Sequence, residues 1–385
     1  MKGFLLLAFM VLVLPGAALS QESFYRSWDM GPSHDPSYFP IGVWLQDPRD
    51  ASAYKAAGIN LYVGLWEGPT LEQLQALKLS GMRVICPQNE TGLEYRKEGI
   101  IAGWLHRDEP DNAQPRRSGF GYGSPIPPAQ VEEEYLAMKK ADPSRPVLLN
   151  LGQGAAWDGW WGRGSRSGHF EDYAEYVKGG DIISFDIYPV AHSSEKVAGK
   201  LELIGQGVER LSRLIRPPQV VWSFIECTGV KTGNKPTPEQ IRSEVWMALV
   251  HGARGIVYFA HEWKPAFSSR ALLKDTATYR EVTRINQQVH ELAAVLNSPE
   301  VGHWGSALAE NPKVHVAARV VKHQEGMYLL SISTGPESSR VRFLIDPEVA
   351  ATQAEELWEN RQIAIQAGAF EDQFTGYQPH IYRLK

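Results

Sequence analysis

Short runs of apolar residues alternate with segments of helical periodicity from about residue 39 onward. Short continuous apolar runs are typical of parallel strands buried on both faces, and helix-like segments between them are typical of βαβ units. Eight such runs occur, at 39–45, 59–66, 82–87, 100–106, 147–151, 182–189, 220–225 and 255–261. This number and rhythm predict an α/β fold of the (β/α)8 TIM barrel type. Strand counting alone leaves a doubly wound open sheet as the alternative.

The rhythm changes near residue 298. Beyond it, β-type segments separated by turns occur at 314–321, 327–333, 341–345 and 377–384. This pattern predicts a small C-terminal β-sandwich domain over 298–385, after a barrel over 21–297. Residues 113–127 are rich in Gly, Pro and Ser and too long for a routine connection, so they are expected to form a wall of the active site.

The first residues have the features of an export signal. Lys2 precedes an apolar run over 4–14, and Ala18-Leu19-Ser20 supplies the small residues that a signal peptidase requires. The run is shorter than the roughly 20 residues that span a bilayer, so we expect a signal peptide over 1–20 that is removed, with a retained anchor as the alternative. The protein is therefore expected to be secreted or periplasmic, with no transmembrane segment after cleavage.

Composition narrows the classes of function. The formal net charge is −5, and this mild acidity argues against a nucleic-acid partner or an anionic membrane surface. Cys86 and Cys227 are too few for a disulfide framework and fall in predicted strands, where buried thiols are expected. The 12 Trp, 15 Tyr and 13 Phe residues offer flat apolar faces that stack on sugars, although large aromatic side chains also fill cores.

Acidic residues stand at the ends of two predicted barrel strands. The fourth strand is followed by Asp108 and Glu109, two adjacent carboxylates of which one could have a raised pKa and donate a proton, or could cap the next segment. The seventh strand ends in Glu226, a single carboxylate that is expensive to bury without a purpose. Strands four and seven lie on opposite sides of an eight-stranded barrel, so their ends can hold two carboxyl groups across one pocket.

This arrangement resembles the clan A glycoside hydrolases, which have an acid/base Glu after strand four and a nucleophilic Glu after strand seven. The resemblance covers about residues 37–297 and is one of pattern. It implies that Glu226 attacks the anomeric carbon while Glu109 protonates the leaving oxygen and then activates water, which is a retaining double displacement.

Two aromatic residues extend the resemblance, and two positions depart from it. Tyr188 stands where the clan often places a Tyr that touches the nucleophile, and Trp263 stands where an aromatic floor under the sugar is usual. Asp108 replaces the Asn that usually precedes the acid/base residue, and Glu67 occupies the region of strand two where an Arg is common. These departures imply that the sugar bound, or the geometry of the site, differs from what is usual in the clan.

Further candidate substrate-binding residues follow other strands. Gln88, Asn150 and Asp186 have polar groups that could bond to sugar hydroxyls, and Trp160 lies in a Gly-rich loop as a stacking platform. The sequence has no metal, phosphate or dinucleotide motif, so no metal and no cofactor is expected.

The combined prediction is a glycoside hydrolase that acts on an extracellular poly- or oligosaccharide. A non-catalytic carbohydrate-binding barrel and an inverting glycosidase are the alternatives. A hydrolase of phosphodiester or ester bonds would need metal ligands or a Ser-His pair, which the strand ends do not offer.

Overall fold

The computed structural model describes residues 23–116, 120–230, 233–264, 266–324 and 326–385. Eight parallel strands form a closed barrel in the order β1 to β8, which confirms the predicted (β/α)8 class and excludes the open sheet. The strands are β1 (Ile41–Trp44), β2 (Leu61–Val63), β3 (Arg83–Pro87), β4 (Ile101–Leu105), β5 (Val147–Leu151), β6 (Ile182–Phe185), β7 (Val220–Glu226) and β8 (Ile256–Phe259). The predicted signal peptide, residues 1–20, lies outside the described residues.

Alternate residues of each strand pack inside the barrel and against the helices outside it. In β7, Trp222 and Phe224 belong to the inner core, whereas Ile225 packs in the outer core. The inner core is closed at the amino ends of the strands by Tyr25, whose hydroxyl accepts a hydrogen bond from Trp222 Nε1 at 2.9 Å. The opposite end, where the strands finish, is therefore where a site can open.

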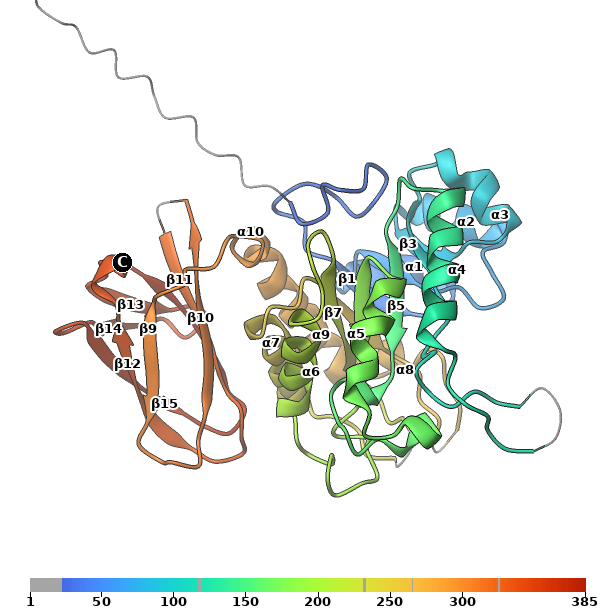
Figure 1. Cartoon of the computed structure of the whole chain (residues 1–385). Helices are drawn as coiled ribbons and strands as arrows, with labels where there is room; N and C mark the ends of the chain where they lie inside the picture. The colour runs from blue at the N-terminus through green and yellow to red at the C-terminus, as the bar shows by residue number, and fades with distance from the viewer. Residues whose placement is uncertain (1–22, 117–119, 231–232, 265, 325) are drawn as a thin grey trace, which may run out of the picture.

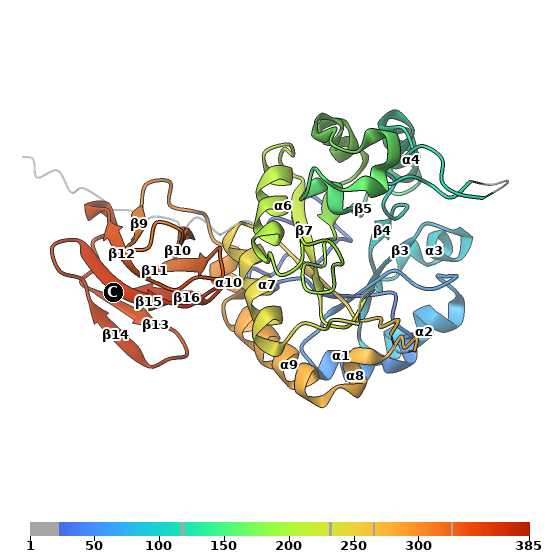
Figure 2. The same ribbon diagram turned by 90° about the horizontal axis from the view of Figure 1, so that it is seen from below.

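Helices surround the barrel (Figure 2). They are α1 (Ala51–Ala56), α2 (Leu71–Ser80), α3 (Glu90–Glu94), α4 (Pro128–Ala141), α5 (Tyr173–Tyr176), α6 (Glu202–Ser212), α7 (Pro238–Val250), α8 (Ala271–Lys274), α9 (Thr276–Glu291) and α10 (Ala293–Leu296). In the described part of the chain, none of these helices has the length and apolar character needed to cross a membrane.

Side-chain caps decide where two of the helices begin. The stretch 91–98 has little helical periodicity, yet α3 forms there because the Asn89 side chain accepts a hydrogen bond from the Gly92 N–H at 2.8 Å. The last helical stretch of the barrel, residues 271–296, is divided into α8, α9 and α10. Asp275 caps α9 by accepting the N–H groups of Ala277 and Thr278, so a new helix begins at that point.

The C-terminal part consists of two antiparallel sheets. One has the strand order β10-β11-β16-β13-β14 and the other β15-β12-β9. The strands are β9 (Gly305–Ala309), β10 (Val316–His323), β11 (Gly326–Ser333), β12 (Ser339–Ile345), β13 (Gln353–Glu356), β14 (Arg361–Ala364), β15 (Ala369–Phe374) and β16 (Pro379–Leu384). This agrees with the predicted C-terminal β domain. The sequence pattern did not reveal β9, β13, β14 and β15.

The C-terminal sheets lie beside the barrel, next to α7 and α10 (Figure 1). Trp358 is the main aromatic contact, because its ring lies 5.6 Å from that of Trp246 in α7 and its Nε1 donates to Glu291 at 3.2 Å. The Tyr377 hydroxyl donates to Glu202 at the start of α6 at 2.7 Å. Aromatic and polar contacts together hold the two parts against each other.

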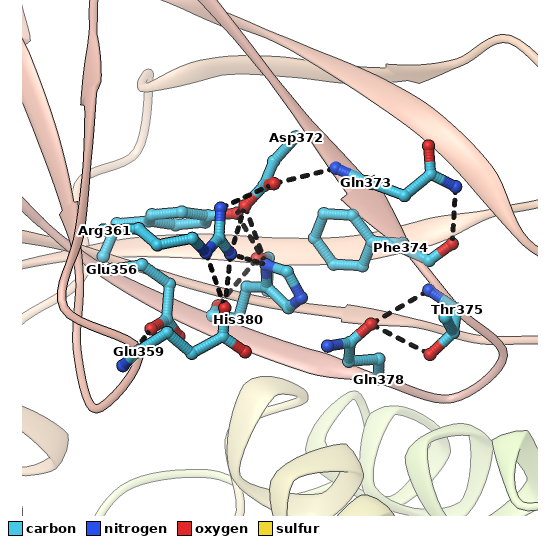
Figure 3. Close-up of polar contacts among 11 residues, drawn as sticks. Glu356, Glu359, Arg361, Asp372, Gln373, Phe374, Thr375, Gln378 and His380 are labelled. Atoms are coloured by element: carbon cyan, nitrogen blue, oxygen red, sulfur yellow. Dashed lines mark hydrogen bonds and ion pairs between the residues drawn. The ribbon is translucent and has the colours of Figure 1, made fainter.

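An ionic cluster stabilises the C-terminal sheets (Figure 3). Asp372 accepts hydrogen bonds from Arg361, from His380 at 2.9 Å and from the Tyr382 hydroxyl at 2.7 Å. Phe374 stacks on the His380 ring at 4.3 Å. Burial opposes the charge of Asp372, but these donors hold its pKa below the usual range. The cluster joins β14, β15 and β16 through a fully bonded carboxylate.

Candidate active site

A cavity of about 320 Å³ opens at the carboxyl ends of the barrel strands. Aromatic side chains form much of its wall, and acidic and amide side chains form the polar part. The aromatic members are Trp44, Trp160, Trp161, Tyr188, Phe224, Phe259 and Trp263, and the polar members include Asp108, Glu109, Asn150, Gln153, Asp186 and His192. Of the residues predicted from the sequence, seven meet here: Asp108, Glu109, Asn150, Trp160, Asp186, Tyr188 and Trp263. We call this space the central cavity.

Glu109 has a strained backbone that the surrounding chain holds in place. Its φ of 42° lies in the left-handed region, which is unfavourable for a residue with a Cβ atom. The Glu109 N–H donates to the Asn150 carbonyl at 3.0 Å. The Glu109 carbonyl accepts from the Asn112 N–H at 3.1 Å and from Gln114 Nε2 at 3.1 Å. These bonds fix a sharp turn directly after β4, which aims the Glu109 side chain into the central cavity.

Glu109 and Asp186 form a carboxyl pair. Burial raises the pKa of Glu109 well above its usual range, and the charge of Asp186 raises it further. Burial raises the pKa of Asp186 to about 6, while hydrogen bonds from Glu109 and Tyr188 oppose the rise. Two carboxyl groups can share a hydrogen bond only if one is protonated. The proton therefore resides on Glu109, and Asp186 is the ionised partner at neutral pH.

Asp108 lies beside this pair and lines the central cavity. Its Oδ1 accepts from Asn150 Nδ2 at 2.9 Å, and Asn150 Oδ1 accepts from the Ser184 hydroxyl at 2.9 Å. Loss of hydration raises the pKa of Asp108 to about 7, and the neighbouring Glu109 adds to the rise. Asn150 thus acts as a link that fixes Asp108 against the barrel wall.

Sequence reasoning missed two residues that support the site. Asp111 is fully buried and accepts the Gly152 N–H at 2.9 Å and the Tyr173 hydroxyl at 2.7 Å, so it ties the loop after β4 to the loop after β5. Asn112 donates to Glu109 and accepts from Trp160 Nε1 at 2.7 Å. The sequence does show that Asp111 is an acidic residue close to Glu109. Its role could not be predicted, because its hydrogen-bond partners Gly152 and Tyr173 are distant in the sequence.

The aromatic residues of the central cavity form stacked and tilted pairs. Trp263 stacks on Phe259, with ring centroids 5.6 Å apart and planes inclined by 12°. The Tyr188 ring is tilted against that of Phe259, with centroids 5.0 Å apart. Trp160 and Trp161 pack together at 4.9 Å on the loop after β5. Flat apolar faces and carboxyl groups thus share one cavity, which suits a ligand with apolar and hydroxylated surfaces.

The structure does not bring Glu226 into this cavity. Its side chain is 0 % exposed, and its two oxygens accept the N–H groups of Val190 at 2.6 Å and Ala191 at 2.9 Å. Ala191 lines the central cavity, so the segment containing these two residues separates Glu226 from the space. The expected pairing of Glu109 with Glu226 across one pocket is therefore replaced by the pairing of Glu109 with Asp186. The path of residues 189–193 decides this, and strand counting does not reveal that path.

A second buried carboxyl, Glu244 of α7, lies against Glu226. Burial raises the pKa of Glu244 well above its usual range, and the charge of Glu226 raises it further. Burial raises the pKa of Glu226 to about 7, against the bonds from Val190, Glu244 and Ala191. Glu244 is accordingly the protonated member, and it donates to Glu226.

Gln88 also lies away from the central cavity. Its Nε2 donates to the Met138 carbonyl of α4 at 3.0 Å. Val84 and Cys86, the preceding residues of the same parity in β3, pack in the outer core. The alternation of strand side chains therefore directs Gln88 toward the helices.

No family model and no curated protein matches this sequence. Solved structures of similar fold include a GH42 β-galactosidase from G. stearothermophilus, at 9% identity and a TM-score of 0.58, which covers 95% of this chain and 100% of that one. A putative α-galactosidase/melibiase from Bacteroides fragilis has 10% identity and a TM-score of 0.55, over 91% and 79% of the two chains. An α-amylase from Geobacillus thermoleovorans, complexed with acarbose, has 12% identity and a TM-score of 0.52, over 91% and 98%. The fold is thus one that glycoside hydrolases use.

Proposed function

We propose that this protein is a glycoside hydrolase in which Glu109 is the proton donor. The observation that supports it is the Glu109–Asp186 pair, which sets a protonated carboxyl beside an ionised one in a cavity walled by aromatic rings. Hydrolysis of a glycosidic bond requires a carboxylic acid that protonates the leaving oxygen and a carboxylate near the positively charged transition state. The fold, which glycoside hydrolases also use, agrees with this chemistry.

Each group of the cavity has a role in this proposal. Glu109 gives its proton to the glycosidic oxygen as the bond between that oxygen and the anomeric carbon breaks. In an inverting course water attacks the anomeric carbon in the same step and Asp108 accepts its proton; in a substrate-assisted course a group of the substrate attacks first, and the Glu109 carboxylate then accepts a proton from the water that follows. Asp186, with Tyr188 donating to it, keeps the proton on Glu109 before the reaction. Asp108 supplies a further carboxylate at the anomeric region. Trp263 offers its ring as the face on which the sugar stacks.

Glu226 has a different role in this proposal from the nucleophilic one that the clan A resemblance implies. Its carboxylate positions the N–H groups of Val190 and Ala191, and through them the cavity wall. A retaining reaction with Glu226 as nucleophile would require that wall to move. An inverting or substrate-assisted course needs no such movement, because water or a group of the substrate makes the attack.

Turnover of a panel of chromogenic glycosides and of soluble polysaccharides tests the proposal. Wild-type protein is expected to hydrolyse at least one member, and Glu109→Gln is expected to bind that member without turnover. Binding without hydrolysis of any member by the wild type would instead support a carbohydrate-binding barrel. The anomer first released, read by NMR, separates an inverting course from the other two, because a nucleophilic Glu226 and a nucleophilic group of the substrate both give retention.

A further inference from the structure

The exposed aromatic side chains of the described residues all lie on one face of the barrel. They are Trp66 after β2, Phe120 and Tyr122 in the loop after β4, Trp161 after β5, and Trp263 and Phe267 after β8. The other large apolar side chains that are exposed in the described part of the chain are leucines. Exposed apolar groups that gather on one surface mark an interaction site, whereas scattered ones are ordinary. This face is the one on which the central cavity opens.

A second cavity, of about 570 Å³, lies at the ends of β1, β2 and β8. Trp66 and Phe267, which are 71% and 62% exposed, line it together with Asp47 and Arg49. Two aromatic rings and several hydrogen-bonding groups thus face one space. We call it the outer cavity.

Hydrogen bonds hold the backbone around Trp66, at the edge of the outer cavity. Gln73 Nε2 donates to the Trp66 carbonyl at 2.9 Å, and the same side chain completes the capping box with Thr70 at the start of α2. Glu67, the next residue, has a φ of 52°, so the chain turns sharply after Trp66. Trp66 is therefore held outward by its surroundings, in a conformation that exposes its ring.

Trp263 joins the outer cavity to the central one. Its ring stacks on Phe259, which lines the central cavity, and it meets Phe267, which lines the outer cavity, edge-on at 5.7 Å. Trp263 is 47% exposed, so part of its surface is open between the two spaces. Aromatic surface therefore continues from the catalytic carboxyls to Trp66.

A third cavity continues from the opposite side of the catalytic carboxyls. It is about 530 Å³ in volume and shares Asp108, Glu109, Trp160 and Trp161 with the central cavity, and it reaches Tyr122 in the loop after β4. Glu109 thus lies between cavities on two sides. A site for a single terminal sugar would need a wall on one of these sides.

Building on the proposed function, we infer that the outer cavity is a distal sugar-binding subsite for a linear poly- or oligosaccharide that passes across the barrel mouth and is cut internally at Glu109. Trp66 and Phe267 stack on sugar units of the chain beyond Trp263, and Arg49 binds their hydroxyls. The ligand is a carbohydrate chain because the aromatic rings alternate with hydrogen-bonding groups and are continuous with the catalytic cavity.

The test compares Trp66→Ala and Phe267→Ala with wild type on short and long substrates. The substrates are an aryl monoglycoside and malto-, cello-, xylo- and chito-oligosaccharides of increasing length. Both variants are expected to lose about tenfold in kcat/KM on the longer oligosaccharides, which corresponds to the stacking of one ring, and to match wild type on the aryl monoglycoside. Leu79→Ala, which removes a 91% exposed leucine from α2, is the matched control and should change neither rate.

Equal rates of wild type and variants on long oligosaccharides would overturn the inference, as would an equal loss on both kinds of substrate. If no substrate is turned over, the proposed function fails, and affinity electrophoresis in gels containing starch, xylan, β-glucan or glycol chitin still tests the subsite. Retardation of wild type, weakened in Trp66→Ala and Phe267→Ala but not in Leu79→Ala, would support the inference. No retardation of wild type in any gel would overturn it.

Discussion

The barrel contains two pairs of carboxyl groups that share a proton, and only one pair faces a cavity. Glu109 and Asp186 line the central cavity, whereas Glu226 and Glu244 are enclosed between β7, α7 and the segment after β6. Burial raises the pKa of all four groups. In sequence terms Glu226 is the more conspicuous residue, since it ends the longest apolar strand of the barrel.

The difference between the pairs lies in how their oxygens are used. Both oxygens of Glu226 accept backbone N–H groups, so its hydrogen-bonding capacity serves the fold. Asp186 Oδ1 has no hydrogen-bond partner among the described residues, and Glu109 keeps its proton next to open space. Burial and a raised pKa are thus common to structural and catalytic carboxyls. Access to a cavity separates the two.

The largest expected effect is on turnover by Glu109→Gln. Loss of a general acid should lower kcat by about 10²–10⁴-fold on substrates with poor leaving groups, and much less on aryl glycosides whose leaving group needs no proton. Steady-state kinetics on both kinds of glycoside measure this. The matched variant Glu226→Gln keeps an acceptor oxygen for the loop and should lose less than about tenfold. A loss in Glu226→Gln as large as that in Glu109→Gln would erase the distinction between the pairs.

Substitution of Glu226, in the enclosed pair, should lower stability more than substitution of Asp186, in the cavity pair. Glu226→Ala leaves the Val190 and Ala191 N–H groups without this acceptor in a buried place, so the free energy of unfolding should fall by about 2–4 kcal/mol. Asp186→Ala should change it by less than about 1 kcal/mol, because water in the cavity can replace the carboxylate. Urea unfolding followed by tryptophan fluorescence compares them. Equal losses would show that the cavity pair is structural too.

The pH dependence of kcat/KM should report the cavity pair. Activity should rise as Asp186 ionises, near its pKa of about 6, and fall at higher pH when Glu109 loses its proton. In Asp186→Asn the rise near pH 6 should disappear, because the titrating group has gone. Initial rates with an oligosaccharide, whose leaving group needs the proton of Glu109, across about pH 4–10 measure both profiles. A rising limb that persists in Asp186→Asn would assign it to another group.

The smallest expected effect is a gain in stability at alkaline pH from Glu244→Gln. Because the folded-state pKa of Glu244 is raised, the folded protein binds a proton that the unfolded chain has released, so stability declines as pH rises from the ordinary carboxyl pKa toward the raised value. A glutamine donates to Glu226 at every pH. The variant should exceed wild type by about 1 kcal/mol near pH 9 and lose this advantage near pH 5.

Urea midpoints at the two pH values measure that gain, with Glu133→Gln on the exposed face of α4 as the control. An advantage of equal size at both pH values would mean that proton binding is not its cause.

Much of the fold and part of the site could be predicted from the sequence. The eight apolar runs identify the barrel strands, and the rule that strand ends face one pocket brings Asp108, Glu109, Asn150 and Asp186 together. The position of Gln88 could also have been predicted, because the alternation of side chains along the strand directs it outward, as it does Cys86. The strands of the C-terminal domain were harder to find, since β13 has the sequence Gln-Ala-Glu-Glu and shows little apolar alternation.

The pairing of carboxyls could not be predicted in this way. It depends on the turn at Glu109 and on the path of residues 189–193 over Glu226, and both are set by hydrogen bonds between residues far apart in the chain. A resemblance based on strand position transfers the place of a residue along a strand. It does not transfer the loop that covers the residue or leaves it open.

The left-handed backbone of Glu109 has a consequence for protein engineering. Glycine adopts such a conformation without steric penalty, so Glu109→Gly would relieve strain of about 1–3 kcal/mol. The substitution that removes the acid would then also raise the melting temperature. A selection for thermostable variants that does not assay turnover would therefore favour inactive protein, which is a trade-off between stability and activity contained in one residue.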